Sequence, residues 1–286
     1  MTENITAAEN KKSGFDLMSV LKTVMKMPIA RIDRTEFLQK ELLKIYPESV
    51  VKTAIEYNPA YAGISRKKIE SLASRAINEE TAKASSLSFL AGLPGGLVMA
   101  ATIPADVAQY FVFILRIMQK LAYLYGFPDF GLTSDDVNNE TMDEVVVFLG
   151  AMLGVETSNA GVKILAHAAS ERVTRVVAEK AVAKASLYPI VERVAASIGV
   201  KLTKSVFAKG VGKAVPVLGG VINGGLTFFT FKPNCKKLQK SFTHLDLSDP
   251  EYYKEQRMNA YRRDLHDKAE AGAAEKGYKG IRLDLE

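Results

Sequence analysis

Cysteine and histidine are scarce in this chain, and their scarcity excludes several classes of protein. Its 286 residues include one cysteine, Cys235, so neither a disulfide framework nor a cysteine-built zinc site is expected. The three histidines, His167, His244 and His266, have no metal-ligand spacing, and the Gly-x-Ser-x-Gly and His-Glu-x-x-His patterns are absent. We therefore expect no metal, no cofactor and no recognisable catalytic motif, and the lone thiol indicates a reducing compartment.

The chain also lacks the signals that would direct it out of the cytoplasm or attach a lipid. Residues 1–14 are polar and include Glu3 and Glu9, unlike the basic and then apolar order of a secretory signal peptide. Thr2 and the C-terminal Asp-Leu-Glu do not fit the patterns for myristoylation and prenylation. We expect a cytoplasmic protein in which any membrane contact comes from the folded chain.

Acidic residues are missing from one long stretch, although the net charge of +6 is modest. Residues 193–245 contain nine Lys or Arg and no acid, whereas residues 246–286 contain ten acids and eight bases. A mixed-charge segment with few large apolar residues has little to bury, so residues 243–286 are predicted to form an exposed tail. The acid-free block before this tail favours an anionic partner.

Helical periodicity recurs along the chain and predicts an all-α fold. Residues 104–125 carry apolar side chains at spacings of three and four, opposite a polar stripe that includes Arg116, Lys120 and Tyr123. This pattern is typical of an amphipathic helix, about 33 Å long at 1.5 Å per residue, that packs one face into a core. Asp106 lies in the first turn, where a carboxylate suits the helix dipole; a functional role for it is the alternative.

Two uncharged apolar segments, residues 84–105 and 214–231, are about as long as membrane-spanning helices. Pro94, Gly95 and Gly96 interrupt the first, and Pro216 with four glycines interrupts the second. Proline removes a backbone donor and paired glycines favour turns, so each segment is predicted to be a broken helical hairpin. Their short halves cannot cross ~30 Å of hydrocarbon. Such hairpins either insert shallowly into a membrane or are buried in a soluble core.

Lysines flank the second apolar segment on both sides. A single span would place only one flank on the cytoplasmic side, so equal flanks favour a hairpin with both ends on the same side. Each lysine near an anionic surface contributes on the order of 1 kcal/mol to binding. The lysines predicted to contact anionic lipid are Lys201, Lys204, Lys209, Lys213, Lys232, Lys236, Lys237 and Lys240. Because they bracket an apolar hairpin without interleaved aromatics, we do not expect nucleic acid as a partner.

The same segments resemble, in order and spacing, the central and C-terminal motifs of the EcsC family of bacterial proteins. The motifs that carry the resemblance are residues 89–96, 103–107, 117–127 and 215–225. It covers roughly residues 50–242, which predicts an EcsC-like domain between an N-terminal helical extension, residues 1–49, and the charged tail. The matching positions are Gly92, Pro94, Gly95, Gly96, Pro104, Asp106, Tyr125, Gly126, Pro216, Gly219, Gly220 and Gly224.

The resemblance implies a membrane-associated helical protein with an accessory role in transport or secretion, and it supplies no catalytic residues. We therefore expect a non-catalytic protein bound peripherally or monotopically to the cytoplasmic face of the membrane, through anionic lipid or a membrane protein. One alternative is a lipid-acting hydrolase whose site, for example Asp106, His167 and Ser170, forms only in three dimensions. The other is a soluble helical module that docks a membrane partner. The oligomeric state stays open.

Overall fold

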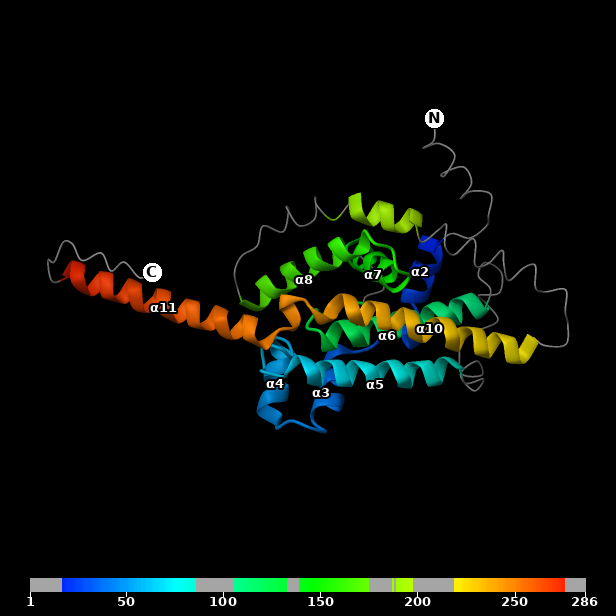
Figure 1. Ribbon diagram of the computed structural model, residues 1–286, viewed down its shortest axis with the longest axis horizontal. Helices are drawn as coiled ribbons and strands as arrows, with labels where there is room; N and C mark the ends of the chain where they lie inside the picture. The colour runs from blue at the N-terminus through cyan, green and yellow to red at the C-terminus, as the bar shows by residue number, and fades with distance from the viewer. Residues whose placement is uncertain are drawn as a thin grey trace, which may run out of the picture.

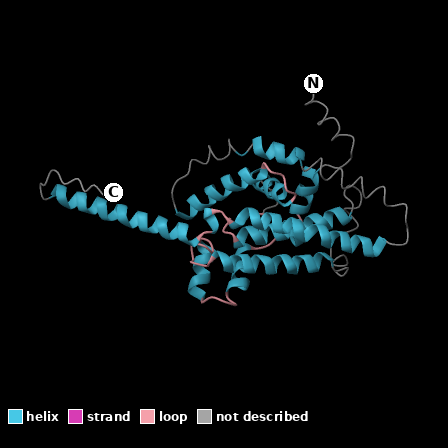
Figure 2. Cartoon of the chain, viewed as in Figure 1, coloured by secondary structure: helices cyan, strands magenta, loops and turns pink. Residues whose placement is uncertain are grey.

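The computed structural model describes residues 17–85, 105–132, 139–174, 187, 189–197 and 219–275 (Figures 1 and 2). Across these ranges the chain is helix and loop with no strand, which confirms the predicted all-α class. Residues 187 and 189–197 are also helical. The other helices are α2 (Leu17–Met25), η1 (Pro28–Ala30), α3 (Arg34–Leu42), α4 (Glu48–Glu56), α5 (Arg66–Ser85), α6 (Ala105–Leu124), α7 (Asn139–Met152), α8 (Ser158–Thr174), α10 (Gly219–Thr243), η5 (Asp246–Ser248) and α11 (Pro250–Glu275).

Local polar groups define the ends of the early helices. The carboxylate of Asp33 caps α3 by accepting a hydrogen bond from the backbone N–H of Glu36 at 2.7 Å. The guanidinium of Arg34 then donates to carbonyls at and just beyond the end of α4, those of Ile55 at 2.6 Å and Tyr57 at 3.0 Å. A cation suits the C-terminal end of a helix because the last carbonyls there lack helical partners.

The helix α6 lies at the centre of the fold, where it packs against α2, η1, α3, α5, α7 and α10 (Figure 1). Every residue from 111 to 126 is buried except Arg116, which is half-buried. The amphipathic helix predicted for residues 104–125 is therefore present, but its polar stripe does not face water. Helices cover that side as well, and they supply polar partners for the stripe.

Three phenylalanine rings connect the helices around the end of α6. Phe127 follows α6, while Phe148 belongs to α7 and Phe242 to α10. Their ring centroids are 5.0 Å apart for Phe127–Phe148, 4.9 Å for Phe127–Phe242 and 5.0 Å for Phe148–Phe242. These separations are typical of favourable aromatic pairs. The triangle joins α7 and the end of α6 to α10, and Phe127 and Phe242 are more than 100 residues apart in the chain.

The second apolar segment differs from its prediction. Residues 219–231 belong to α10, a continuous helix that runs on to Thr243 with Pro233 inside it. The break expected from the glycines is therefore wrong for these residues, because a glycine costs only about 1 kcal/mol in a helix, and α10 is stabilised by packing against α5, α6 and α7. Residues 214–218 and most of the first apolar segment, 86–104, lie outside the described residues.

One hydrophobic cluster extends from Leu17 to Tyr253, so the boundaries predicted at residues 49 and 242 do not divide the core. The predicted tail also begins inside this core. Asn58 donates to the hydroxyl of the buried Tyr253 at 2.8 Å, and Arg66 pairs with Asp249 at 2.8 Å. Farther along α11, each residue from 257 to 271 is exposed, and the helix projects from the body there (Figure 1).

Candidate functional site

Half of the predicted lysines lie on the described part of α10. Lys236, Lys237 and Lys240 are exposed, and Lys232 is half-buried. On a helix, positions 236, 237 and 240 share one side, so three ammonium groups project from little more than one turn. We call these three exposed residues the lysine face. The other predicted lysines lie outside the described residues: Lys201, Lys204, Lys209 and Lys213.

The opposite side of α10 holds the lysine face in place. Phe231, Cys235, Leu238 and Phe242 are each fully buried, at spacings of four and three residues. Burial raises the pKa of the Cys235 thiol, which therefore stays protonated at neutral pH and acts as a small apolar side chain. The second half of α10 is thus amphipathic, with an apolar anchor and a basic outer side.

Polar neighbours orient the lysine face without neutralising it. Lys236 donates to the hydroxyl of Ser74 on α5 and to the side-chain oxygen of Gln239, both at 2.8 Å. Lys237 donates to the side-chain oxygen of Asn234 at 3.3 Å. Partial burial, and then the charge of Lys232, lower the pKa of Lys236. Within the described residues, none of the three lysines forms an ion pair with a carboxylate, so their positive field extends into solvent.

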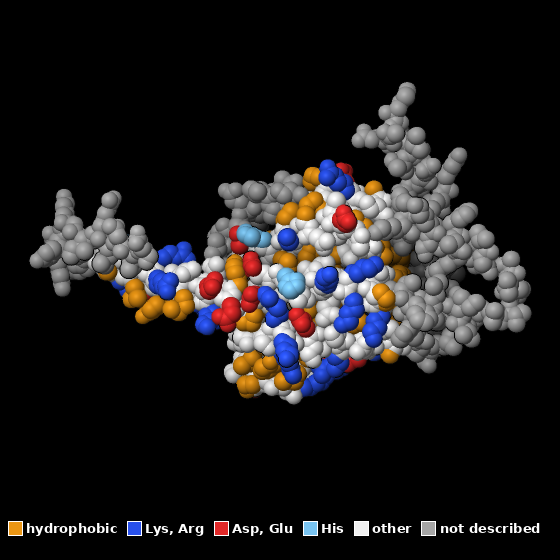
Figure 3. Space-filling view, in the orientation of Figure 1, with side chains coloured by type: hydrophobic (Ala, Val, Ile, Leu, Met, Phe, Trp, Pro, Cys, Tyr) orange, Lys and Arg blue, Asp and Glu red, His pale blue; other side chains and the backbone are white. Residues whose placement is uncertain are grey.

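The surface view separates the charges in the same way. In Figure 3, Lys and Arg side chains gather on the face that α10 and α5 cross, whereas acidic side chains gather nearer the base of α11. On α5, the side chain of Lys67 is also exposed. Because the basic and acidic side chains gather in different places, the positive field over α10 and α5 is stronger than the modest net charge suggests.

Tyr125 and Gly126, two of the positions that carry the EcsC resemblance, have packing roles. Gly126 has a φ of +98°, and a Cβ there would lie 2.9 Å from the carbonyl oxygen of Leu247, so only glycine fits without strain. The hydroxyl of Tyr125 lies 3.3 Å from that of Thr243. Both residues therefore hold the end of α6 in place, Tyr125 against the end of α10 and Gly126 against η5.

The remaining motif positions have no described side chains. Gly219, Gly220 and Gly224 are helical residues of α10, and Asp106 is a residue of α6 whose side chain is not described. The others lie outside the described residues: Gly92, Pro94, Gly95, Gly96, Pro104 and Pro216.

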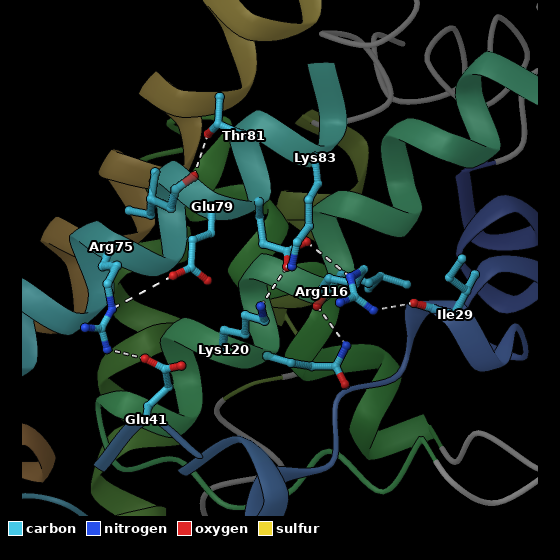
Figure 4. A network of polar contacts seen from close by, with 12 residues as sticks. Ile29, Glu41, Arg75, Glu79, Thr81, Lys83, Arg116 and Lys120 are labelled. Atoms are coloured by element: carbon cyan, nitrogen blue, oxygen red, sulfur yellow. Dashed lines mark hydrogen bonds and ion pairs between the residues drawn. The ribbon is translucent and has the colours of Figure 1, made fainter. Parts of the chain in front are cut away.

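A buried ionic cluster next to α6 was not predicted from the sequence (Figure 4). The carboxylate of Glu80 on α5 is fully buried, and it pairs with Lys120 at 2.6 Å, Arg116 at 3.1 Å and Lys83 at 3.3 Å. Arg116 also donates to the carbonyl of Ile29 in η1 at 2.7 Å. Burial alone would raise the pKa of Glu80, but the charges of Lys120 and Arg116 outweigh it, so the pKa is lowered.

The amide of Gln119 extends this polar layer. Its oxygen accepts from the N–H of Ile32 at 3.0 Å, and its nitrogen donates to the carbonyl of Ala30 at 2.7 Å. It thus replaces the backbone partners that the segment around η1 lacks. Three long polar residues within five positions of a mostly apolar helix, Arg116, Gln119 and Lys120, are the sequence signal that could have indicated this layer.

Two of the three residues considered for a hydrolase site have described side chains, His167 and Ser170, and no hydrogen bond joins the imidazole to the hydroxyl; the side chain of Asp106 is not described. His167 is largely exposed and its Nδ1 lies 3.4 Å from the carboxylate of Glu171. The hydroxyl of Ser170 donates to the backbone carbonyl of His167 at 2.9 Å. A serine nucleophile would donate this hydrogen bond to the imidazole of its general base, whereas the Ser170 hydroxyl donates to a backbone carbonyl. No group of three or more His, Cys, Asp or Glu side chains in the described part of the chain is arranged to hold a metal ion.

Comparison with known proteins assigns no family to this chain. No family model, curated protein or solved structure matches the chain. The EcsC resemblance therefore stays a prediction from the motifs. In the ranges that the structure describes, no helix has both the length and the apolar character needed to cross a bilayer.

Proposed function

We propose that this protein is a helical, EcsC-like protein that binds the cytoplasmic face of a bacterial membrane through the lysine face of α10, with anionic lipid headgroups as its ligand. The role is one of binding, peripheral or monotopic, and it serves as an accessory to transport or secretion. A membrane protein partner is compatible with the same surface.

The observation that carries the proposal is the arrangement of Lys236, Lys237 and Lys240. They share one exposed side of a helix whose other side is anchored in the core, and they have no acidic partner in the described residues. The same helix begins with residues 219–231, a stretch without a charged residue. Basic residues beside an apolar helical segment are typical of surfaces that contact anionic membranes.

The test is co-flotation of the purified chain with vesicles of neutral lipid alone or of neutral lipid with phosphatidylglycerol. The triple variant K236Q/K237Q/K240Q removes three surface charges, each worth on the order of 1 kcal/mol near such a surface. We expect the partition coefficient for anionic vesicles to fall about 100-fold. Because exposed charges are screened by salt, binding of the unchanged chain should also decrease as the ionic strength rises.

The matched control is K22Q/K40Q/K52Q, which removes the same charge from exposed lysines on α2, α3 and α4. We expect it to bind anionic vesicles nearly as well as the unchanged chain. Equal loss in both triple variants would mean that only the net charge matters. A chain that does not float with anionic vesicles at low salt would contradict the proposal and favour the soluble docking module.

A further inference from the structure

The projecting part of α11 carries an apolar stripe that no other described element of the chain covers. Met258, Tyr261 and Leu265 are 48%, 59% and 48% exposed, the large exposed apolar side chains of this helix. Their spacings of three and four residues place them on one side of α11. In Figure 3, hydrophobic side chains follow one edge of this helix. An exposed stripe of this kind is typical of a helix that pairs with another helix.

Charged residues border the stripe with a defined order of signs. Glu255 and Arg262 lie on one flank, and Arg257 and Asp264 lie on the other. Within each flank the two residues are seven positions apart, which is about two helical turns. One flank therefore runs from acid to base along the chain, and the other runs from base to acid.

This order is self-complementary in an antiparallel pair of helices. With Met258 opposite Tyr261 of a second copy, each flank meets the same flank reversed. Glu255 then faces Arg262 of the second copy, Arg257 faces Asp264 of the second copy, and the two-fold axis repeats both contacts. In a parallel pair the unlike flanks meet, and Arg257 would face Arg262 of the second copy. The charges thus favour the antiparallel arrangement and oppose the parallel one.

The contacts that these four residues already make within one chain indicate which of the two ion pairs between copies forms more easily. Glu255 and Arg262 make no ion pair or side-chain hydrogen bond within the described residues. Arg257 already lies over the ring of Tyr61 at 4.9 Å, and Asp264 pairs with Lys268 at 2.8 Å. The contact between Glu255 and Arg262 is therefore the one that costs least to form.

We propose that two copies of this chain associate through an antiparallel pairing of their α11 helices, centred on Met258 and Tyr261 of the stripe. A contact that covers only a few helical turns is small beside typical stable interfaces, so we expect the dissociation constant to be on the order of micromolar. The dimer would place two lysine faces in one assembly and so strengthen any surface binding by avidity. The pairing itself does not depend on membrane binding.

The first test is sedimentation velocity of the full chain over a range of concentrations. We expect reversible dimers, and we expect R262E to weaken them about tenfold because two attractive contacts become repulsive. The double variant E255R/R262E reverses both charges and should restore the original dissociation constant. R263E makes the same charge change on the opposite side of α11 and should leave it unaltered.

The second test is disulfide cross-linking between M258C and Y261C chains that carry tags of different size. We expect the mixed pair to cross-link faster than either variant alone, with the buried Cys235 unreactive in the unsubstituted chain. A chain that stays monomeric at all concentrations, a weakening by R263E equal to that by R262E, no restoration in the double variant, or preferential linking of Cys at 258 to itself would each overturn the proposal. These variants change exposed positions, so circular dichroism should show unchanged helix content.

Discussion

The helices α6 and α11 are both long and both carry charged residues, yet those residues meet opposite surroundings. The polar residues of α6 are enclosed by six neighbouring elements, and Lys120 is only 7% exposed. Most charged residues of α11 lie in water, where Lys268 pairs with Asp264 across one turn. A buried ion pair leaves an uncompensated charge when one partner is removed, whereas an exposed pair is replaced by water.

The largest effect is expected at Glu80. The variant Glu80→Gln keeps the shape of the side chain but leaves the buried Lys120 and the half-buried Arg116 without their counter-charge. We expect the free energy of unfolding to fall by about 3–5 kcal/mol, the usual cost of breaking a buried pair. Urea denaturation followed by circular dichroism measures this change.

A second variant removes one cation from the same cluster. Lys120→Met leaves Glu80 paired with Arg116 and Lys83, so its loss of stability should be smaller than that of Glu80→Gln. Exposed ion pairs contribute below about 1 kcal/mol to the free energy of unfolding. If Glu80→Gln lowers it by no more than this, the buried cluster is energetically like the exposed pairs of α11, and the difference between the two helices does not hold.

A change of pH is expected to have an intermediate effect on the free energy of unfolding. Glu41 on α3 pairs with Lys44 and Arg75, as Glu80 pairs with its own Lys and Arg partners. The pKa values of both carboxyl groups are lowered, since these partners outweigh the effect of burial. Each group then contributes stability that is fully present above its unfolded pKa of about 4.3 and is lost as the pH falls through its folded pKa. The free energy of unfolding, measured between pH 7 and pH 3, should therefore decrease on acidification.

The comparison variant is again Glu80→Gln, which removes one of the two groups that cause this dependence. Its loss of stability between pH 7 and pH 3 should be smaller than that of the unchanged chain. Identical pH profiles for the two proteins would contradict the lowered pKa of Glu80.

The smallest effect is expected on α11. Lys268→Gln removes an ion pair whose side chains are 73% and 54% exposed. We expect the free energy of unfolding to change by about 0.5 kcal/mol or less, in the same urea experiment. A loss comparable to that of Glu80→Gln would mean that this part of α11 is covered in solution, which would sharpen the case for a partner on that helix.

Part of the fold and of the site could be read from residue patterns. Apolar spacing predicted the all-α class and the helix over residues 104–125, and charge counting singled out the lysines later found on α10. The partners of Arg116 and Lys120 could not be predicted, because Glu80 lies some forty positions away and reaches them only through the packing of α5 on α6. The glycines of α10 misled the prediction, since a local preference for turns is weaker than the packing of a whole helix.

By itself, the sequence determined the helical class, the separation of basic and mixed-charge segments and the periodic placement of apolar side chains, because these depend on composition and on spacing along one chain. Only the tertiary structure decided which polar stripe is buried and which is exposed. Arg116 and Lys120 of α6 lie under α5, whereas the charges of α11 project beyond the core. Periodicity gives the direction of a side chain on its helix; what it meets there depends on which other helices pack against that side.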